Sequence, residues 1–366
     1  MKKERDSGIE LLRIFAMFMV IGVHLLLYGN YFSIALEMGG KTQEAAVILK
    51  LFLRCAVNIF IIITGFFSVR SKSDFKKTYK RVLKIYSSIL FYSIVLSLLT
   101  IFLGENFRTI EGTTYSVSEI IIKMFFPVSS QCWYFLTNYI LLMLIVPFLN
   151  ITLNNITKKQ YTVLLIILGY IMSVWLFIGK LNIFKNVASD YGYDMIIEGK
   201  NIFSFIFLYI IGGYISLHIK ATNKPKIRYL VLAISTVAIN YLLLSKLNPE
   251  INYVSVAYGY ANPLVILCAV FIFLFFKDLH FKSKIINMLG STTIGVYAIS
   301  EFSFFREWLW NIFDFTKFNC SNTFKTYLKI LGVILIIFLG CSIIDLLRQR
   351  LFSRIESIYK KLRKTE

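Results

Sequence analysis

The sequence lacks the short motifs by which many soluble enzymes are recognised. Its 366 residues contain no Walker loop, no GxGxxG, no HExxH and no GxSxG. Nucleotide hydrolysis, metal-dependent hydrolysis and an α/β-hydrolase domain therefore have no support. The five cysteines are scattered, with no CxxC pair and no metal-like spacing, so we predict no metal site and no resident cofactor. No internal repeat and no appended soluble domain is evident.

Charge is also scarce, because 16% of the residues are charged whereas 57% are hydrophobic. The mean hydropathy is +0.68. Repeated apolar runs of about 18 to 22 residues predict an all-α, polytopic membrane protein with about ten transmembrane helices. These helices are predicted at residues 9–28, 46–69, 83–103, 133–153, 161–179, 201–219, 228–245, 258–276, 286–305 and 327–347.

Acidic residues are few, with 20 Asp and Glu against 40 Lys and Arg. In a soluble protein this balance would suggest nucleic acid. Here the basic residues gather in alternate connecting segments, as expected for loops that face the cytoplasm and meet anionic lipids. We therefore expect a multi-pass protein of the plasma membrane with both termini in the cytoplasm and no nucleic-acid partner. Residues 1–347 would form the membrane domain, and 348–366 a basic tail lying on the inner leaflet as an amphipathic helix.

The first predicted helix carries Glu10, Arg13 and His24, although ionisable groups at membrane depth are costly and usually serve a function. At about 100° per residue, Arg13 and His24 lie roughly 20° apart in azimuth and about 16 Å apart along the axis. Glu10 falls within about 40° of His24 by the same count. The helix therefore presents one polar stripe, around which we expect the rest of the chain to be arranged.

Each residue of this stripe has a chemical and a structural interpretation. His24 could take a proton from a hydroxyl and return it, or could be a hydrogen-bonded histidine that packs two helices. Arg13 could hold a phosphate or a thioester carbonyl, could reach the cytoplasmic headgroups, or could pair with Glu10 one turn away. Because His24 and Arg13 share a face, we favour the chemical interpretation.

A second group of candidates is predicted at the cytoplasmic side. Thr64 and Gly65 end the second span, where they could admit a ligand or allow close helix packing. Arg81 and Lys84 open the third span within a basic run. Most of that run would set topology, but this i, i+3 pair is well placed to meet phosphates.

The third group is predicted toward the outer side. Arg54 and Asn58 lie at i, i+4 on the second span, at a depth similar to that of His24. Trp133 and Tyr134 could form part of an interfacial aromatic belt or stack on a sugar ring. Tyr297 and Glu301 are one turn apart on the ninth span. Glu301 could be an acid/base partner, a ligand of the acceptor hydroxyl or an interfacial residue.

The chain resembles the integral-membrane acyltransferase 3 family in four places. The first helix has the family's Arg-x10-His pattern in Arg13 and His24. Residues 57–67 resemble its apolar helix that ends in Ser-Gly-aromatic, with Thr64 in place of the usual Ser. The pair Arg81 and Lys84 resembles its basic-x-x-basic pair, with Lys where Arg is usual. The fourth place is the Trp-Tyr helix ending in Pro, here Trp133, Tyr134, Tyr139 and Pro147.

A weaker match covers 290–300, where Ser300 stands at a position that is commonly His in the family. This difference puts a two-histidine mechanism in doubt and leaves His24 untouched. The resemblance implies O-acylation of a cell-surface or lipid-linked glycan, with acyl-CoA, usually acetyl-CoA, as the cytoplasmic donor and no other cofactor. It implies that His24, Arg13 and Glu10 take part in catalysis, with His24 either deprotonating the acceptor hydroxyl or taking part in a relay of the acyl group.

In this scheme Arg81, Lys84, Thr64 and Gly65 would bind acyl-CoA, and the outer group would face the acceptor. The protein would acylate its acceptor directly or hand the acyl group to a separate partner. The competing interpretation is a polysaccharide or solute transporter or flippase without acyl transfer. Ten helices and buried charges would suit that class equally well.

Overall fold

The computed structural model describes residues 6–71, 75–110, 112–130, 132–178, 198–220, 222, 225–247, 257–318, 320 and 322–362. The ten predicted spans can be tested only within these residues, and most of the segment between the predicted spans 161–179 and 201–219 lies outside them. The chain is helical almost throughout, as the sequence predicts. Within the ranges just given, one short hairpin pairs β1 (Thr109–Ile110) with β2 (Thr113–Thr114).

The helices follow one another in this order: α1 (Ser7–Tyr28), α2 (Tyr31–Met38), α3 (Gly40–Leu53), α4 (Ala56–Ser68), α5 (Phe75–Leu103), η1 (Glu105–Phe107), α6 (Val117–Phe125), α7 (Tyr134–Asn155), α8 (Lys158–Gly169), the π-helical turn η2 (Tyr170–Val174), α9 (Trp175–Ile178), α11 (Ile202–His218), α12 (Arg228–Leu247), α14 (Pro263–Phe276), α15 (Lys284–Gly290), α16 (Thr293–Ser300), α17 (Ser303–Ile312), η4 (Phe315–Lys317) and α18 (Thr323–Leu362).

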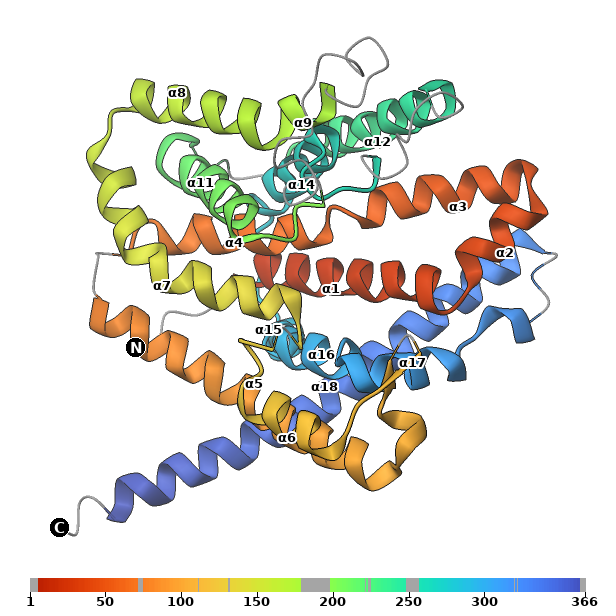
Figure 1. Ribbon diagram of the computed structural model, residues 1–366. Helices are drawn as coiled ribbons and strands as arrows, with labels where there is room; N and C mark the ends of the chain where they lie inside the picture. The colour runs from red at the N-terminus through yellow and green to blue at the C-terminus, as the bar shows by residue number, and fades with distance from the viewer. Residues whose placement is uncertain are drawn as a thin grey trace.

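The first helix is the centre of the molecule. Figure 1 shows α1 in the middle of the assembly, with α3 and α4 above it and α15, α16 and α17 below. It packs against α2, α3, α4, α14, α15, α16, α17 and α18. The carboxylate of Asp6 caps its first turn by accepting a hydrogen bond from the Gly8 amide at 3.0 Å. The chain is thus built around the helix that bears the polar stripe.

Six helical segments of the described chain are long and apolar enough to cross a membrane. They are Ser7–Tyr28, Gly40–Ser68, Phe75–Leu103, Tyr134–Asn155, Arg228–Lys246 and Thr323–Ile358. Two shorter apolar helices, Ile202–His218 and Pro263–Phe276, coincide with the predicted sixth and eighth spans. The chain is therefore a multi-pass helical membrane protein, and the number ten remains a prediction.

Two predicted spans are interrupted where polar side chains lie. The second has a turn at Arg54 and Cys55, between α3 and α4. The ninth, predicted as one helix over 286–305, consists of three short helices, and α16 ends just before Glu301. Irregular backbone at membrane depth is tolerated where protein buries it. These interruptions place Arg54 and Glu301 in the interior of the bundle.

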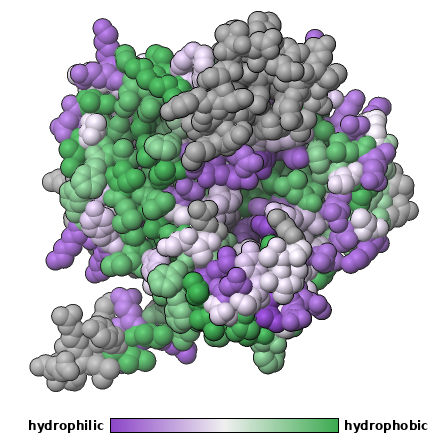
Figure 2. Space-filling view, in the orientation of Figure 1, coloured by the Kyte–Doolittle hydropathy of each residue, from purple (hydrophilic) through white to green (hydrophobic). Residues whose placement is uncertain are grey.

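The last helix runs without a break from its apolar half into the basic tail. The predicted boundary between the membrane domain and the basic tail, at residues 347 and 348, falls inside α18. This helix continues to Leu362 and projects beyond the other helices at the lower left of Figure 1. Figure 2 shows hydrophobic side chains over much of the left half of this face, with hydrophilic side chains at its left edge and in its centre. All five cysteines are free and buried.

A histidine–carboxylate pair beside an internal cavity

His24 and Glu301 lie together at the C-terminal half of α1. Nδ1 of His24 is 3.0 Å from Oε2 of Glu301, and the two side chains are 15% and 3% exposed. This is ion-pair distance, although the present ring orientation does not meet hydrogen-bond geometry. Catalytic hydrogen bonds often tighten only when substrate binds. A carboxylate at one imidazole nitrogen can orient the ring and stabilise its protonated form.

Tyr28 and Arg306 extend this pair toward the C-terminal end of α1. The ring of Tyr28 stacks on His24 with a centroid separation of 5.6 Å and an interplanar angle of 5°. The guanidinium of Arg306 lies 4.3 Å from the centroid of the same tyrosine ring. The Tyr28 ring is thus in contact with both the imidazole of His24 and the guanidinium of Arg306 on α17.

Arg54 and Asn58 bind the segment that precedes α14. The Arg54 Nε donates to the carbonyl oxygen of Tyr258 at 2.5 Å, and its Nη1 lies 3.3 Å from the hydroxyl of Tyr260. The amide of Asn58 donates to the carbonyl oxygen of Tyr260 at 3.0 Å, and Asn58 is fully buried. Both predicted acceptor-side residues therefore also hold this segment against α3 and α4.

Trp133 and Tyr297 are buried, and Tyr134 is half-buried. The indole N–H of Trp133 donates to the carbonyl oxygen of Ala298 at 3.1 Å, which ties the start of α7 to α16. Tyr134 stacks on Tyr260 with centroids 6.5 Å apart. Trp133 and Tyr297 are 2% and 7% exposed. Tyr134 and Tyr297 line a cavity that also contains His24.

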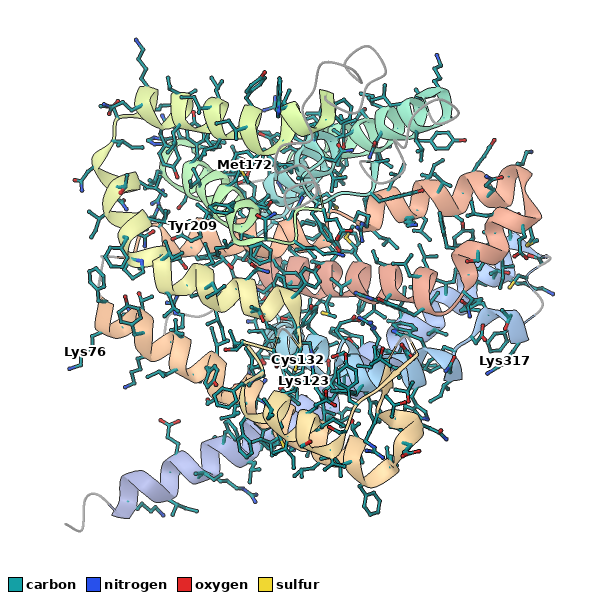
Figure 3. The ribbon with its side chains drawn as sticks, in the orientation of Figure 1. Lys76, Lys123, Cys132, Met172, Tyr209 and Lys317 are labelled. Carbon is teal, nitrogen blue, oxygen red and sulfur yellow. The ribbon has the colours of Figure 1, made fainter. Side chains whose placement is uncertain are left out.

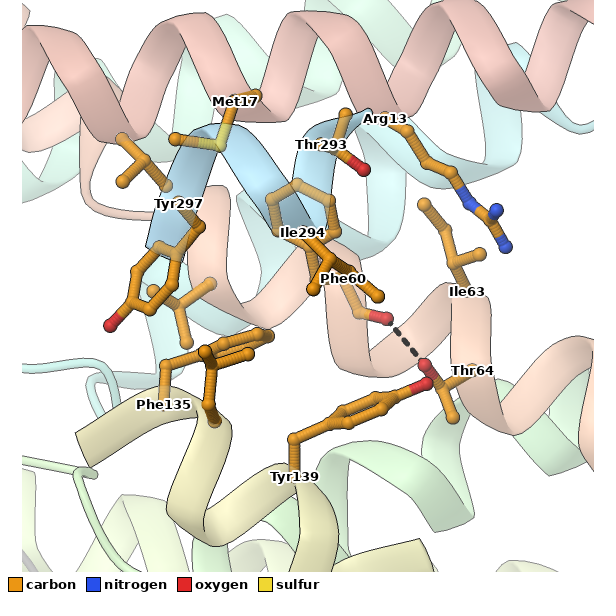
Figure 4. Close-up of a pocket in the computed structure, with 13 residues that line it drawn as sticks. Arg13, Met17, Phe60, Ile63, Thr64, Phe135, Tyr139, Thr293, Ile294 and Tyr297 are labelled. Carbon is orange, nitrogen blue, oxygen red and sulfur yellow. Dashed lines mark hydrogen bonds between the residues drawn. The ribbon is translucent and has the colours of Figure 1, made fainter. Parts of the chain in front are cut away.

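A larger cavity of about 100 Å³ lies between α1, α4, α7 and α16. Its wall is mostly aliphatic and aromatic, and Figure 4 shows the Arg13 side chain at one end and Tyr297 at the other. Thr64 and Tyr139 also line this cavity. A pocket that is mainly apolar with a few polar groups is typical of a ligand site.

The larger cavity adjoins the small one that contains His24. The two cavities share Val20, Val57 and Tyr297 in their walls. The smaller has a volume of about 10 Å³, about the space of one water molecule. The polar stripe of α1 thus has open volume beside it at both ends, with a constriction at these three side chains.

Glu10 and Arg13 are paired, as one of the sequence interpretations predicts. Nη1 of Arg13 lies 3.3 Å from Oε1 of Glu10, and the side chains are 32% and 6% exposed. Glu10 packs against Gly290 so closely that a Cβ there would lie 2.4 Å from Oε2. Glu10 therefore fixes the guanidinium at the mouth of the larger cavity and has no direct place in its wall.

Thr64 and Gly65 have different surroundings although they are neighbours. Thr64 lines the cavity, and its hydroxyl donates to the carbonyl oxygen of Phe60 at 2.9 Å, as the dashed line in Figure 4 marks. Gly65 packs on α11, where a Cβ would lie 2.2 Å from the carbonyl oxygen of Tyr209. Tyr209 is fully buried. Gly212 approaches Ile62 in the same way. Close helix packing therefore accounts for Gly65.

Arg81 and Lys84 lie on the first turns of α5 with exposed side chains, and neither lines the cavity. In Figure 3 the nearby Lys76 projects outward at the left, at the end opposite Lys317. Their predicted contact with acyl-CoA phosphates stays a prediction, one that requires the nucleotide end of the donor to extend beyond Arg13.

The sequence interpretation did not single out Tyr28, Tyr260 or Arg306. Tyr28 lies at i, i+4 from His24, so helical spacing could have found it. Nothing local to Arg306 or Tyr260 places them beside α1, because only folding brings these segments together. Within the described ranges, no three His, Cys, Asp or Glu side chains gather in a way that could hold a metal ion.

The fold and this site define a multi-pass helical membrane protein with a histidine–carboxylate pair beside an internal cavity. A family model described as an acyltransferase domain matches residues 6–346, nearly the whole chain. The chain therefore belongs to the acyltransferase 3 family, and it is a membrane acyltransferase. Neither the curated proteins nor the solved structures contain a significant match to it.

Proposed function

We propose that this enzyme transfers an acyl group, in the simplest case acetyl, from cytoplasmic acyl-CoA to a hydroxyl of a cell-surface or lipid-linked polysaccharide. The observation that carries the proposal is the pair of adjoining cavities along α1. One begins at Arg13, and the other contains His24 beside Glu301. The enzyme would lie in the plasma membrane with Arg13 toward the cytoplasm, as the distribution of basic residues predicts.

The larger cavity suits the donor. Arg13 offers a guanidinium that Glu10 already orients, and guanidinium groups bind phosphates through paired hydrogen bonds. The aliphatic wall suits the pantetheine arm and the thioester. Arg13 and His24 are about 16 Å apart along the helix axis, comparable to the length of that extended arm. In this arrangement the thioester reaches the constriction at Tyr297.

The chemical step needs one group that can move a proton. With Nδ1 facing Glu301, Nε2 of His24 is free to accept the proton of the acceptor hydroxyl. The acceptor oxygen then forms a bond to the thioester carbonyl carbon, and the carbon–sulfur bond breaks. The thiolate of CoA leaves with the electron pair and receives the proton from Nε2. Glu301 stabilises the imidazolium between these events and is not itself protonated.

The test is a His24→Ala substitution in protein that reaches the membrane at the normal level. Mass spectrometry of surface glycans should show loss of the acyl group. His280→Ala is the matched control, because that side chain is half exposed and pairs with Asp6 at 2.6 Å. Glycan acylation that persists in His24→Ala would overturn the assignment. Glycan transport by purified protein that binds no acetyl-CoA would favour the transporter interpretation instead.

A further inference from the structure

Three cations surround the outer side of the histidine–carboxylate pair. Arg306 lies over the Tyr28 ring that stacks on His24. Arg54 and Lys200 lie 4.3 Å and 5.7 Å from the ring centroids of Tyr260 and Tyr134, and both of these rings line the small cavity with His24. The three cations come from α17, from the turn after α3 and from the segment before α11. Lys200 is paired with Glu198 at 2.7 Å. Arg54 and Arg306 have no carboxylate within ion-pair distance among the residues that the structure describes.

Arg306 has hydrogen-bonding capacity that the described part of the chain does not use. Its guanidinium lies over the Tyr28 ring at 4.3 Å, and that ring stacks on His24. Its Nε is buried and has no hydrogen-bond partner there. A buried donor without a partner costs roughly 1–3 kcal/mol, and more when the group is charged. Such a donor beside a reactive imidazole indicates a ligand acceptor atom.

A fourth cation, Lys50, lies one helical turn outward from Arg54. Its ammonium is 3.6 Å from the ring centroid of Phe32 and 4.1 Å from that of Tyr258. Lys50 is 9% exposed, and no described carboxylate pairs with it. Like charges at i, i+4 repel, so Lys50 and Arg54 together reduce the stability of α3. Aromatic rings hold both cations in place without neutralising them.

Phe32 and Tyr258, the two rings beside Lys50, also border a third cavity. This outer cavity has a volume of about 470 Å³ and lies between α2, α3 and α12. Phe32, Tyr241 and Tyr258 supply aromatic surface, and Gln43, Glu44 and Ser245 supply polar groups. Cavities of about 300–1,000 Å³ commonly hold small ligands. Aromatic faces with amide, carboxylate and hydroxyl groups suit the apolar faces and the hydroxyls of sugar rings.

Topology does not explain these cations. Basic residues are expected on cytoplasmic loops, whereas Lys200 and Arg306 flank predicted spans on the outer side. Lys50 and Arg54 lie in the outer half of the predicted second span, where a charge is costly and usually functional. Two arginines and a lysine around one acid/base pair create a positive potential at the outer approach to His24. A positive potential of this kind attracts an anion and raises its local concentration.

We propose that the acceptor is an acidic glycan, with a carboxylate or phosphate close to the hydroxyl that is acylated. The anionic group binds Arg306 and Arg54, the hydroxyl then faces Nε2 of His24, and the neighbouring sugars extend toward Lys50 and the outer cavity. This inference rests on the proposed function, because it names the acceptor class for the same site.

The test measures binding and acyl transfer separately on purified full-length protein in detergent or nanodiscs. The ligands are 4-nitrophenyl β-glucuronide and 4-nitrophenyl β-glucoside, which differ only in a carboxylate in place of a hydroxymethyl group. Glucose 6-phosphate and glucose form the phosphate arm. We expect the anionic member of at least one pair to bind about tenfold more tightly. The preference should shrink between about 50 mM and about 500 mM salt.

Substitutions assign the preference to the named cations. Arg306→Gln and Arg54→Gln should each reduce the anionic-to-neutral ratio to about threefold or less, and the Lys variants should restore most of it. If Arg54→Gln does not fold, Lys50→Met, which keeps the packing between the rings, replaces it. Lys325→Gln is the control for net charge, because that side chain is exposed. It should leave the ratio unchanged.

The outcomes separate this inference from the proposed function. Anionic ligands that bind selectively but are never acylated in the presence of acetyl-CoA would support the cationic site and contradict the acyl-transfer proposal. Acylation of neutral and anionic acceptors with equal kcat/KM would support acyl transfer and overturn the inference. Equal binding of both members of both pairs, or a ratio unchanged in Arg306→Gln and Arg54→Gln, would also overturn it.

Discussion

Nδ1 of His24 lies 3.0 Å from Oε2 of Glu301, so the first helix and the break between α16 and α17 share one acid/base pair. We predict that Glu301→Gln lowers kcat about 10²–10⁴-fold with little change in the KM for acyl-CoA, because an amide cannot stabilise the imidazolium. The pH profile of kcat should also move, which a purely structural role would not cause. Glu37→Gln is the control, since that carboxylate is exposed on α2. An unchanged pH profile would contradict the pairing.

The larger cavity predicts a specific role for Arg13. Arg13→Ala should raise the KM for acetyl-CoA about tenfold or more, because hydrogen bonds between charged groups contribute about 1.5–3 kcal/mol. S-acetylpantetheine, which lacks the nucleotide phosphates, separates the two interpretations of this residue. If Arg13 holds phosphate, the variant and the wild type should use that donor equally. An equal loss with both donors would assign Arg13 to the thioester carbonyl instead. Arg13→Lys should rescue part of the loss.

Tyr297 lies where the two cavities meet. We predict that Tyr297→Ala joins them, admits water to the thioester and increases acceptor-independent hydrolysis of acetyl-CoA several-fold, because closed sites protect reactive groups from water. Transfer to the acceptor should fall at the same time. Tyr297→Phe keeps the ring and serves as the control, with hydrolysis near the wild-type rate. Release of free CoA, followed with a thiol reagent, measures the effect. No increase in Tyr297→Ala would argue that the constriction is formed elsewhere.

Gly65 and Gly212 lie at the closest approach of α4 and α11. A Cβ at either position would lie 2.2 Å from a carbonyl oxygen of the other helix. Gly65→Ala should therefore reduce the free energy of unfolding by about 1–3 kcal/mol through overpacking. Purified protein is heated in steps, and size-exclusion chromatography measures how much folded protein remains at each temperature. The variant should have a lower Tm.

Gly332→Ala on α18 is the matched control for this packing, since nothing lies within 4 Å of a Cβ there. It should leave the Tm unchanged or raise it slightly, because alanine favours the helix. If Gly65 instead contacts acyl-CoA, the folded Gly65→Ala protein would have a raised KM for the donor and a normal Tm.

The sequence predicted the class of the protein because hydrophobicity and helical periodicity are local properties. Long apolar runs are sufficient to predict membrane helices. The spacing of Arg13 and His24 is sufficient to place both on one face of α1, where the structure has each of them lining a cavity. Glu301 was a candidate acid/base partner for the same reason, since a carboxylate within an apolar segment is costly.

Only the tertiary structure decided which candidates meet. The pairing of His24 with Glu301 depends on a helix break that the apolar pattern over 286–305 does not reveal. Gly65 and Thr64 are adjacent in sequence, yet helix packing directs one to α11 and the other to the cavity. Arg306 beside Tyr28 has no local signal at all. Contacts between distant segments follow from how helix surfaces fit together, and a single sequence does not contain that relationship in its local pattern.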